Sequence, residues 1–284
     1  MTSFRALVGT VFLSAIVFQS CLVHGNFYSD TYFNWGAKHA YIFGDGDDLN
    51  LVLDQSAGSG VQSHKSYLFG SIELLIKLVP GNSAGTVTAY YLSSTGDYHD
   101  EIDFEFLGNS TGEPYTMHTN IFTQGKGNRE QQFKLWFDPT ADFHNYTIHW
   151  NPTAVVWYVD SIPIRVYRNY KSEGIGFPDE QGMQVYSSLW NADNWATRGG
   201  LVKIDWTGAP FRAELVNGTG PLAFSNVPIL TEANWWTSPD YMQLSSDQQW
   251  KLKWVRDNYM IYNYCTDYER FHWQMAPECS KPQY

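Results

Sequence analysis

The segment at residues 101–106, inside the longer motif 99–109, alternates strictly between acidic and apolar residues, and this pattern restricts the local fold more than any other in the chain. Its acids are Glu101, Asp103 and Glu105. The residue after each acid is apolar: Ile102, Phe104 and Phe106. Successive side chains of a β-strand point to opposite faces of the sheet. The segment therefore predicts a strand with three carboxyls on one face and three apolar side chains in a core.

Three like charges on one face of a strand repel each other, so sheets usually avoid them. Their titrations are expected to be coupled, which can keep one glutamic acid protonated while another is ionised. Paired carboxyls with these two roles are typical of glycosidic bond cleavage. Asp103 lies between Glu101 and Glu105 and can orient a nucleophile or tune its pKa. Two alternatives stay open, namely a solvated acidic face and a calcium-binding face.

The spacing of the acids does not decide the stereochemistry. On a strand, the Cα atoms of Glu101 and Glu105 would lie roughly 13 Å apart. Long side chains on a curved sheet can bring the two carboxyl groups closer. A small gap between them fits retention and a larger one, with room for a water, fits inversion. The pattern alone leaves both open.

Short strands are expected throughout the middle of the chain, from about residue 67 to 205. Apolar or alternating runs at 71–79 and 86–92 are separated by Gly and Pro turn signals. The runs at 154–159 and 162–166 flank Asp160-Ser161, which predicts a hairpin. This pattern indicates an all-β fold, namely an antiparallel β-sandwich.

The composition changes after about residue 226. The segment 244–259 mixes apolar residues with Lys and Arg, and it predicts a short helix capped by Ser245, Ser246 or Asp247. We therefore expect a C-terminal extension packed on the sandwich. The predicted divisions are a secretory signal peptide at 1–25, a catalytic β-sandwich at 26–225 and the extension at 226–284.

Several features of the sequence predict export from the cell. Arg5 precedes an apolar run at 7–18, and cleavage is expected after Gly25. A membrane anchor is the alternative, but the run is short for a span. Cys265 and Cys279 are the cysteines left after this cleavage, and in an oxidising compartment they predict one disulfide.

Glycosylation sequons begin at Asn109, Asn145 and Asn217. Asn109 is the best candidate for modification, because Gly108, Gly112 and Pro114 mark a surface turn around it. Asn145 lies in a run that predicts a strand.

Charge and aromatic content restrict the partners. The formal net charge of −11 argues against nucleic acid and anionic membranes. A neutral polymer is compatible with an acidic cleft. The 12 Trp, 19 Tyr and 17 Phe residues supply flat faces for stacking on sugar rings as well as core material. The cysteines and histidines lack the spacing of a zinc site, and we expect neither a metal nor another cofactor.

Residues 99–109 resemble the active-site signature of plant xyloglucan endotransglucosylase/hydrolases, in glycoside hydrolase family 16. The resemblance extends over essentially all of the chain that follows the expected signal peptide. The supporting segments are 80–87, 118–120, 127–131, 135–140, 187–200 and 267–271.

The resemblance implies a curved, concanavalin-like jelly roll with an open cleft across one sheet. By position, Glu101 would be the nucleophile, Glu105 the general acid/base and Asp103 the assisting acid. Cleavage would proceed with retention through a covalent glycosyl-enzyme, and the glucan would pass to another xyloglucan chain. The expected protein is a secreted monomer of the plant cell wall or apoplast.

The resemblance also assigns substrate-binding positions. These are His118, Thr119, Asn120, Asn128, Arg129, Glu130, Asn194, Trp195, Gly199 and Arg270. The chain departs from the family pattern in three places: Asn194 stands where Asp is usual, a first disulfide is missing around 209–221, and His272-Trp273 replaces a common proline.

Three alternative functions stay open at this stage. The enzyme can act mainly as a xyloglucan hydrolase, or it can transfer from another β-glucan, such as mixed-linkage glucan or cellulose. A lectin that binds glucan without cleaving it is the non-enzymatic alternative. The intact acid triplet argues against the lectin.

Overall fold

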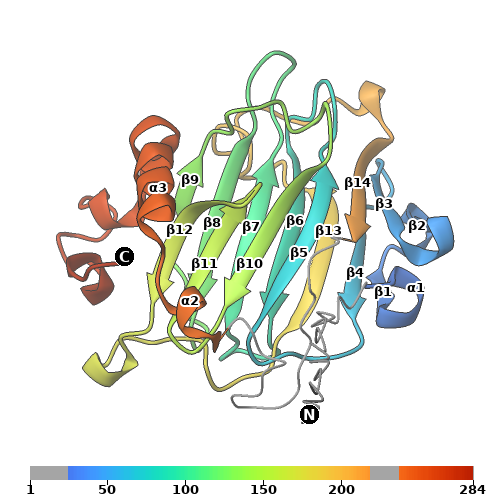
Figure 1. Cartoon of the computed structure of the whole chain (residues 1–284). Helices are drawn as coiled ribbons and strands as arrows, with labels where there is room; N and C mark the ends of the chain where they lie inside the picture. The colour runs from blue at the N-terminus through green and yellow to red at the C-terminus, as the bar shows by residue number, and fades with distance from the viewer. Residues whose placement is uncertain (1–24, 218–236, 284) are drawn as a thin grey trace, which may run out of the picture.

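The computed structural model describes residues 25–217 and 237–283, and these form two antiparallel sheets stacked as a sandwich (Figure 1). The expectation of an all-β sandwich is confirmed. The expected signal peptide, apart from Gly25, and the expected division between 225 and 226 lie outside the described residues. No helix among the described residues is long and apolar enough to cross a membrane.

The first sheet has eight strands and carries the acidic segment. In spatial order its strands are β1 (Thr31–Trp35), β4 (Ser59–Ser63), β13 (Gln184–Asn191), β6 (Thr86–Ser93), β7 (Glu101–Leu107), β8 (Thr116–Phe122), β9 (Gln131–Phe133) and β15 (Met260–Asn263). The acidic strand β7 therefore lies in the interior of the sheet, between β6 and β8.

The second sheet has seven strands and covers the inner face of the first (Figure 1). In spatial order its strands are β12 (Ile162–Arg168), β11 (Ala154–Val159), β10 (His144–Trp150), β5 (Gly70–Lys77), β14 (Phe211–Asn217), β3 (Asp48–Leu53) and β2 (Ala40–Phe43). The predicted hairpin at Asp160-Ser161 is confirmed. Both residues have positive φ, 48° and 63°, which is the backbone of the tight turns that match strand twist.

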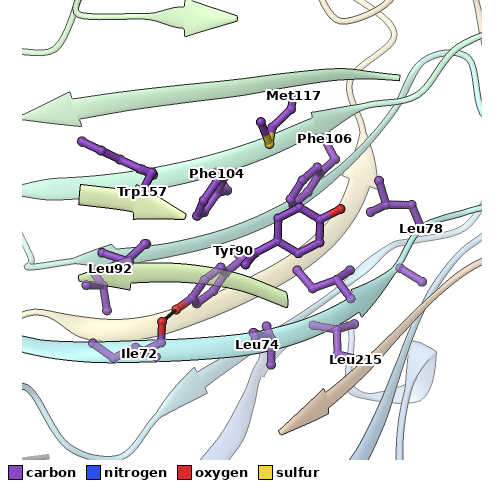
Figure 2. Packing of buried hydrophobic residues seen from close by; sticks show 14 of the residues in the cluster. Ile72, Leu74, Leu78, Tyr90, Leu92, Phe104, Phe106, Met117, Trp157 and Leu215 are labelled. Carbon is purple, nitrogen blue, oxygen red and sulfur yellow. Dashed lines mark hydrogen bonds between the residues drawn. The ribbon is translucent and has the colours of Figure 1, made fainter. Parts of the chain in front are cut away.

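The core fills the space between the two sheets. Ile102, Phe104 and Phe106 of β7 are completely buried, as the alternating pattern predicts. Figure 2 shows Phe104 and Phe106 beside Tyr90, whose hydroxyl donates to the carbonyl of Ile72 at 2.9 Å. Burying one such aromatic side chain contributes about 1.5–3 kcal/mol to stability, so the inner face of β7 anchors this strand.

Short helices occur mainly outside the two sheets. Within residues 25–217 and 237–283 they are α1 (Phe27–Asp30), α2 (Pro239–Met242), α3 (Ser246–Asn258), and the 3₁₀ turns η1 (Ala37–His39), η2 (Gly44–Gly46), η3 (Lys171–Glu173), η4 (Trp206–Gly208), η6 (Tyr264–Thr266) and η7 (Pro277–Ser280).

The C-terminal extension packs on one edge of the sandwich, where α3 lies against β12 and β15 (Figure 1). The predicted helix is confirmed as α3. Of the three candidate caps, Ser245 is the one used, and Gln248 completes a capping box with it. Leu252 and Val255 are the buried residues of α3. After α3 the chain adds β15 to the edge of the first sheet, beside β9, so the extension prolongs the sheet that carries the acids.

Candidate active site

The outer face of the eight-stranded sheet, turned away from the core, carries the three acids. Cross-strand pairing places Tyr91 of β6 and Asn120 of β8 on either side of Asp103. The same pairing places Ala89 and His118 on either side of Glu105. Because directly paired residues of a sheet share a face, these rows form one surface. The strict alternation of β7 thus puts its carboxyls together, as the sequence predicts.

This surface is hollowed into a cleft of about 570 Å³. Its lining residues are Trp35, Ala89, Tyr91, Glu101, Asp103, Glu105, His118, Asn120, Phe122, Glu130, Ser188, Trp190 and Trp195. All three acids lie within this one hollow, between aromatic side chains on either side. A flat, neutral polymer with many hydroxyl groups fits such a lining, because aromatic faces take its apolar sides and the polar groups take its hydroxyls.

Glu105 is the acid best suited to hold a proton near neutrality. Burial raises its pKa from an ordinary 4.5 to about 7, and the charges of Glu101 and Glu130 add to the rise. A catalytic acid works best when its pKa lies near the working pH. Glu105 can therefore donate a proton at the pH at which an ordinary glutamate has lost it.

The electrostatic environment of Glu101 differs from that of Glu105. Burial raises its pKa, but a hydrogen bond with Ser93 and the nearby ring of His99 act in the opposite direction. The Nε2 atom of His99 lies 4.0 Å from the Glu101 carboxylate. These partners favour the ionised form. The two glutamates therefore have environments suited to different protonation states, which is the condition for separate acid and nucleophile roles.

Asp103 lies between them and is almost completely buried. Burial is the main cause that raises its pKa well above the ordinary value, and the negative charges of Glu105 and Glu101 add to it. Its Oδ1 atom has no hydrogen-bond partner among the described residues. A protonated Asp103 can donate a hydrogen bond to an adjacent carboxylate or to a bound sugar.

His118 faces Glu105 as a neutral ring. Its Nδ1 lies 3.8 Å from Oε2 of Glu105. Burial lowers the pKa of His118 to about 4, so the imidazole carries no charge at higher pH. Among the described residues neither ring nitrogen has a hydrogen-bond partner. The neutral ring therefore keeps one donor and one acceptor nitrogen beside Glu105.

On the core side of the first sheet, Trp157 and Arg165 of the second sheet contact the strands that carry the acids and their neighbours. The indole N–H of Trp157 donates to the carbonyl of Asp103 at 3.0 Å. Arg165 is fully buried, lies 4.7 Å above the Trp157 ring, and donates to the carbonyl of Thr119 at 2.8 Å. Its positive charge opposes the rise of the Asp103 pKa. The pattern of β7 gives no sign of these two residues, because they lie more than fifty positions away in the sequence.

On one side of the cleft, charged residues of the first sheet and the extension meet. Arg270 makes a two-pronged ion pair with Glu130, with N–O distances of 2.8 and 2.9 Å. It also donates to Oδ1 of Asn128 at 2.9 Å. Three of the expected binding residues, far apart in sequence, are thus joined at this side of the cleft.

The other expected binding residues fall into three groups, of which two lie at the cleft. His118, Asn120 and Trp195 line the cleft, and the rings of His118 and Trp195 meet edge to face at 6.4 Å. Asn194 and Gly199 are exposed in the loop that carries Trp195.

Two of the expected binding residues point elsewhere. The Thr119 side chain is completely buried on the inner face and accepts a hydrogen bond from Arg165 at 2.9 Å. Arg129 turns toward the extension and pairs with the buried Glu278 at 2.6 Å. Strand alternation explains Thr119, since His118 and Asn120 occupy the outer face. The side chains of Thr119 and Arg129 thus contact the second sheet and the extension and do not line the cleft.

The cleft is also lined by Trp35, Tyr91 and Ser188, which no sequence motif assigned to it. The indole of Trp35 lies on Gly60, where an added Cβ would come within 2.1 Å of Nε1. Tyr91 stacks on Tyr186 at 4.8 Å. Alternation within 86–92 was a usable signal for Tyr91. Trp35 gave no such signal, because β1 reaches the cleft only through the strand order.

The remaining predicted features are located as follows. Cys265 and Cys279 form the expected disulfide, with a Cα–Cα distance of 5.3 Å. Asn109 lies half-buried at the turn after β7. The side-chain amides of Asn145 and Asn217 donate to Glu73 and to the carbonyl of Gly25. Glycosylation of Asn109 stays a prediction.

Two protein families match the chain. The family described as glycosyl hydrolases family 16 matches residues 27–208, and the xyloglucan endo-transglycosylase (XET) C-terminus matches residues 231–279. Xyloglucan endotransglucosylase protein 1 of Diospyros kaki is 53% identical over 274 residues, covering 96% of this chain and 94% of the relative. Xyloglucan endotransglucosylase/hydrolase protein 22 of Arabidopsis thaliana is 52% identical over 279 residues, covering 95% and 96%.

Solved structures resemble the sandwich. The β-glucanase of Bacillus licheniformis superposes with a TM-score of 0.54 at 23% identity, covering 66% of this chain and 89% of that one. The laminarinase catalytic domain of Thermotoga maritima gives 0.53 at 18% identity, covering 66% and 88%. At these identities the likeness concerns the fold.

Proposed function

The chain belongs to glycosyl hydrolase family 16, and within it to the xyloglucan endotransglucosylase/hydrolases. We propose that its cleft cleaves a xyloglucan backbone and transfers one fragment to a second xyloglucan chain. Xyloglucan is both donor and acceptor in this reaction. The observation that carries the proposal is the set of three carboxyls on the outer face of β7, where Asp103 is buried and the two glutamates are partly buried. The environments of Glu101 and Glu105 favour different protonation states.

In the first step Glu101 is the nucleophile. Its carboxylate attacks the anomeric carbon of the donor and forms a glycosyl ester, while the bond from that carbon to the leaving glucan oxygen breaks. Glu105 gives its proton to the leaving oxygen, so the departing chain ends in a hydroxyl. Asp103 is the assisting acid, and its hydrogen bond orients the Glu101 carboxylate.

In the second step Glu105 acts as a base. It takes the proton of the 4-hydroxyl of an acceptor glucan, whose oxygen attacks the anomeric carbon and releases Glu101. Two displacements at one carbon restore its configuration. If water replaces the acceptor, the same step hydrolyses the donor. The ratio of the two outcomes depends on how well the acceptor side excludes water and holds the acceptor.

Sugar contacts are assigned to residues that line or border the cleft. His118, Asn120, Glu130 and Trp195 line it. Arg270 of the extension orders Glu130, and Asn128 accepts a hydrogen bond from Arg270. Asn194 and Gly199 complete the rim on the Trp195 loop. Thr119 and Arg129 are positioning residues, whose side chains bond to Arg165 and Glu278.

We further propose that the protein is a secreted monomer that works in the plant cell wall. The signal-like sequence at 1–25 and the disulfide between Cys265 and Cys279 support export. Secretion is tested by the N-terminal sequence of the protein recovered outside the cell, which should begin at Asn26. Light scattering of the purified protein should give a mass of one chain.

The activity is tested with unlabelled xyloglucan as donor and a labelled xyloglucan oligosaccharide as acceptor. Label in high-molecular-mass polymer supports transfer, whereas falling viscosity without incorporation indicates a hydrolase. The same donor set should include mixed-linkage glucan and cellulose. Incorporation from those donors alone would overturn the substrate assignment.

The roles of the two glutamates are separated by rescue with azide, a small nucleophile. Glu101→Ala should lose transfer, and azide should then attack the donor directly and give a glycosyl azide of inverted configuration. Glu105→Ala with an activated donor should give the azide of retained configuration, because Glu101 still forms the ester. Glu113→Ala, at an exposed glutamate on the turn after β7, is the matched control and should transfer like the wild type.

A further inference from the structure

A pair of exposed aromatic side chains lies on the C-terminal extension, in the turn at residues 267–274. Trp273 is 77% exposed and Tyr268 is 44% exposed. Their rings stack at 5.1 Å with planes 20° apart. The stack holds both rings in one orientation while leaving a broad apolar face of Trp273 open to solvent.

The backbone of this turn is strained where it presents the indole. His272 and Trp273 both have positive φ, 48° and 64°. Bulky side chains disfavour this left-handed region, and such strain tends to occur at functional sites. The conformation is held by hydrogen bonds from the N–H of Trp273 to the Tyr268 carbonyl at 2.9 Å and from the N–H of His272 to the Glu269 carbonyl at 3.2 Å.

A row of paired residues leads from the acids to this turn. Glu105 pairs with His118 of β8, His118 pairs with Gln132 of β9, and Gln132 pairs with Tyr262 of β15. At the usual separation of neighbouring strands, Tyr262 lies roughly 14 Å from Glu105 across the outer face. The row runs in the direction of the extension, away from Trp35.

The turn is attached at the end of this row. The hydroxyl of Tyr262 donates to Oδ2 of Asp267 at 2.8 Å and accepts from Arg270 at 2.9 Å. Arg270 in turn holds Glu130, which lines the cleft. The turn that carries Tyr268 and Trp273 is therefore joined at two points to the outer face, one of them a cleft-lining residue.

We propose that Tyr268 and Trp273 form an aromatic platform for a distal part of the acceptor glucan. The occupant follows from continuity with the cleft. The row toward this turn starts at Glu105, which in the proposed mechanism acts on the leaving and acceptor oxygens, so a glucan on this side of the acids is the acceptor and meets this turn next. The platform offers an apolar face without a charge of its own, which suits the face of a neutral sugar ring. This inference rests on the proposed function, and it assigns the platform to long acceptors in particular.

The test compares acceptors of two lengths, a single xyloglucan repeat and an oligomer of several repeats. Trp273→Asn removes the indole but keeps a residue that tolerates positive φ. It should raise KM for the long acceptor about threefold to tenfold more than for the short one, the range expected for losing one aromatic stack. Trp273→Phe retains a ring and should recover most of the difference.

The matched control is Trp250→Ala, because Trp250 of α3 is also exposed, at 65%, and lies outside the turn. It should leave both KM values at the wild-type level. Equal KM changes for the two acceptors in Trp273→Asn, or no change in either, would overturn the platform. Thermal unfolding of each variant separates loss of the platform from loss of the fold.

A binding measurement distinguishes failure of the platform from failure of the proposed function. In a Glu101→Ala background, the oligomer of several xyloglucan repeats should perturb tryptophan fluorescence, and Trp273→Phe should remove part of that change. If the wild type transfers no glucan, the proposed function fails, whatever this titration gives. If the wild type transfers normally and Trp273→Phe leaves the fluorescence change intact, the platform fails alone.

Discussion

The two faces of β7 belong to one strand, yet one is completely buried and uncharged while the other holds three carboxyls. On the inner face, Phe104 and Phe106 contact Tyr146 within the core, with ring centroids 5.7 and 4.6 Å away. On the outer face, burial raises the pKa values of Glu101, Asp103 and Glu105. The inner face stabilises the fold, whereas the outer face costs stability in order to hold acids at unusual protonation states.

This contrast shows how a rigid site can be built from carboxyl groups that repel each other. Apolar burial of about 1.5–3 kcal/mol for each large side chain fixes the strand. The mutual repulsion of the acids then cannot push them apart without disturbing the core. Substitutions on the two faces should therefore have opposite consequences for activity and stability.

The largest effect is expected for Glu105→Gln on the outer face. Loss of the general acid should lower kcat by about 10²–10⁴-fold. The same change should raise the free energy of unfolding at pH 8 by about 1–3 kcal/mol, because a poorly solvated charge is removed. Transfer kinetics and denaturant unfolding measure the two quantities. A variant that is both inactive and less stable would contradict the division between the faces.

Phe104→Ala on the inner face should act in the opposite sense. Deleting this buried ring should lower the free energy of unfolding by about 3–5 kcal/mol, through lost burial and the cavity left behind. Phe43 of β2 is the matched control, because it is 46% exposed. Phe43→Ala should cost less than half as much in the same denaturant measurement. Equal losses would show that β7 has no special place in the core.

The pH dependence of transfer should reveal the acids directly. Activity requires Glu105 protonated, so the alkaline limb should have its midpoint at about pH 7. Beyond it the rate should fall about tenfold per pH unit, as for a single ionisation. The acid limb should lie above the ordinary carboxyl value, because burial raises the pKa of Glu101. His118, with a pKa of about 4, stays neutral across the active range.

The contribution of Glu105 to the free energy of unfolding should decrease as the pH rises. The folded Glu105 keeps its proton up to about pH 7, whereas the unfolded chain releases it near 4.5. Between these values the folded state binds more protons, so the contribution of this group to stability falls as pH rises. Glu105→Gln should flatten that part of the stability profile. An unchanged slope would contradict the raised pKa.

The smallest effect concerns two threonines of β6, the strand that pairs with β7. Thr88 is completely buried and its hydroxyl has no hydrogen-bond partner among the described residues. Thr86 is equally buried, but its hydroxyl donates to the carbonyl of Ser83 at 2.8 Å. Thr88→Val should raise the free energy of unfolding by about 1 kcal/mol, and Thr86→Val should lower it by a similar amount. The same sign for both would contradict this assignment.

Much of the architecture follows from local patterns. Alternation predicted both faces of β7, and Asp160-Ser161 predicted the hairpin between β11 and β12. These predictions succeed because strand periodicity and turn chemistry act over a few residues. For α3, the sequence offered three caps, and the capping box with Gln248 selected Ser245.

Other features of the site depend on contacts between distant segments. Trp35 lines the cleft because β1 joins the sheet through β4 and β13, an order that no local pattern encodes. Arg165 lies beneath the acids because β12 belongs to the opposite sheet. Thr119, within an expected binding motif, turned out to face the core, since a strand cannot present three consecutive side chains on one face.

The local pattern was enough to predict that three acids share one face of a strand and that their apolar neighbours enter a core, because side-chain alternation is a property of the extended backbone. How those acids titrate depends on contacts between distant segments. The pKa of Glu105 depends on burial and on Glu130, and that of Asp103 depends also on Arg165, charges that reach the site through strand pairing and sheet packing. Solvent exclusion and the distances between charges are set only once the two sheets and the extension have packed together.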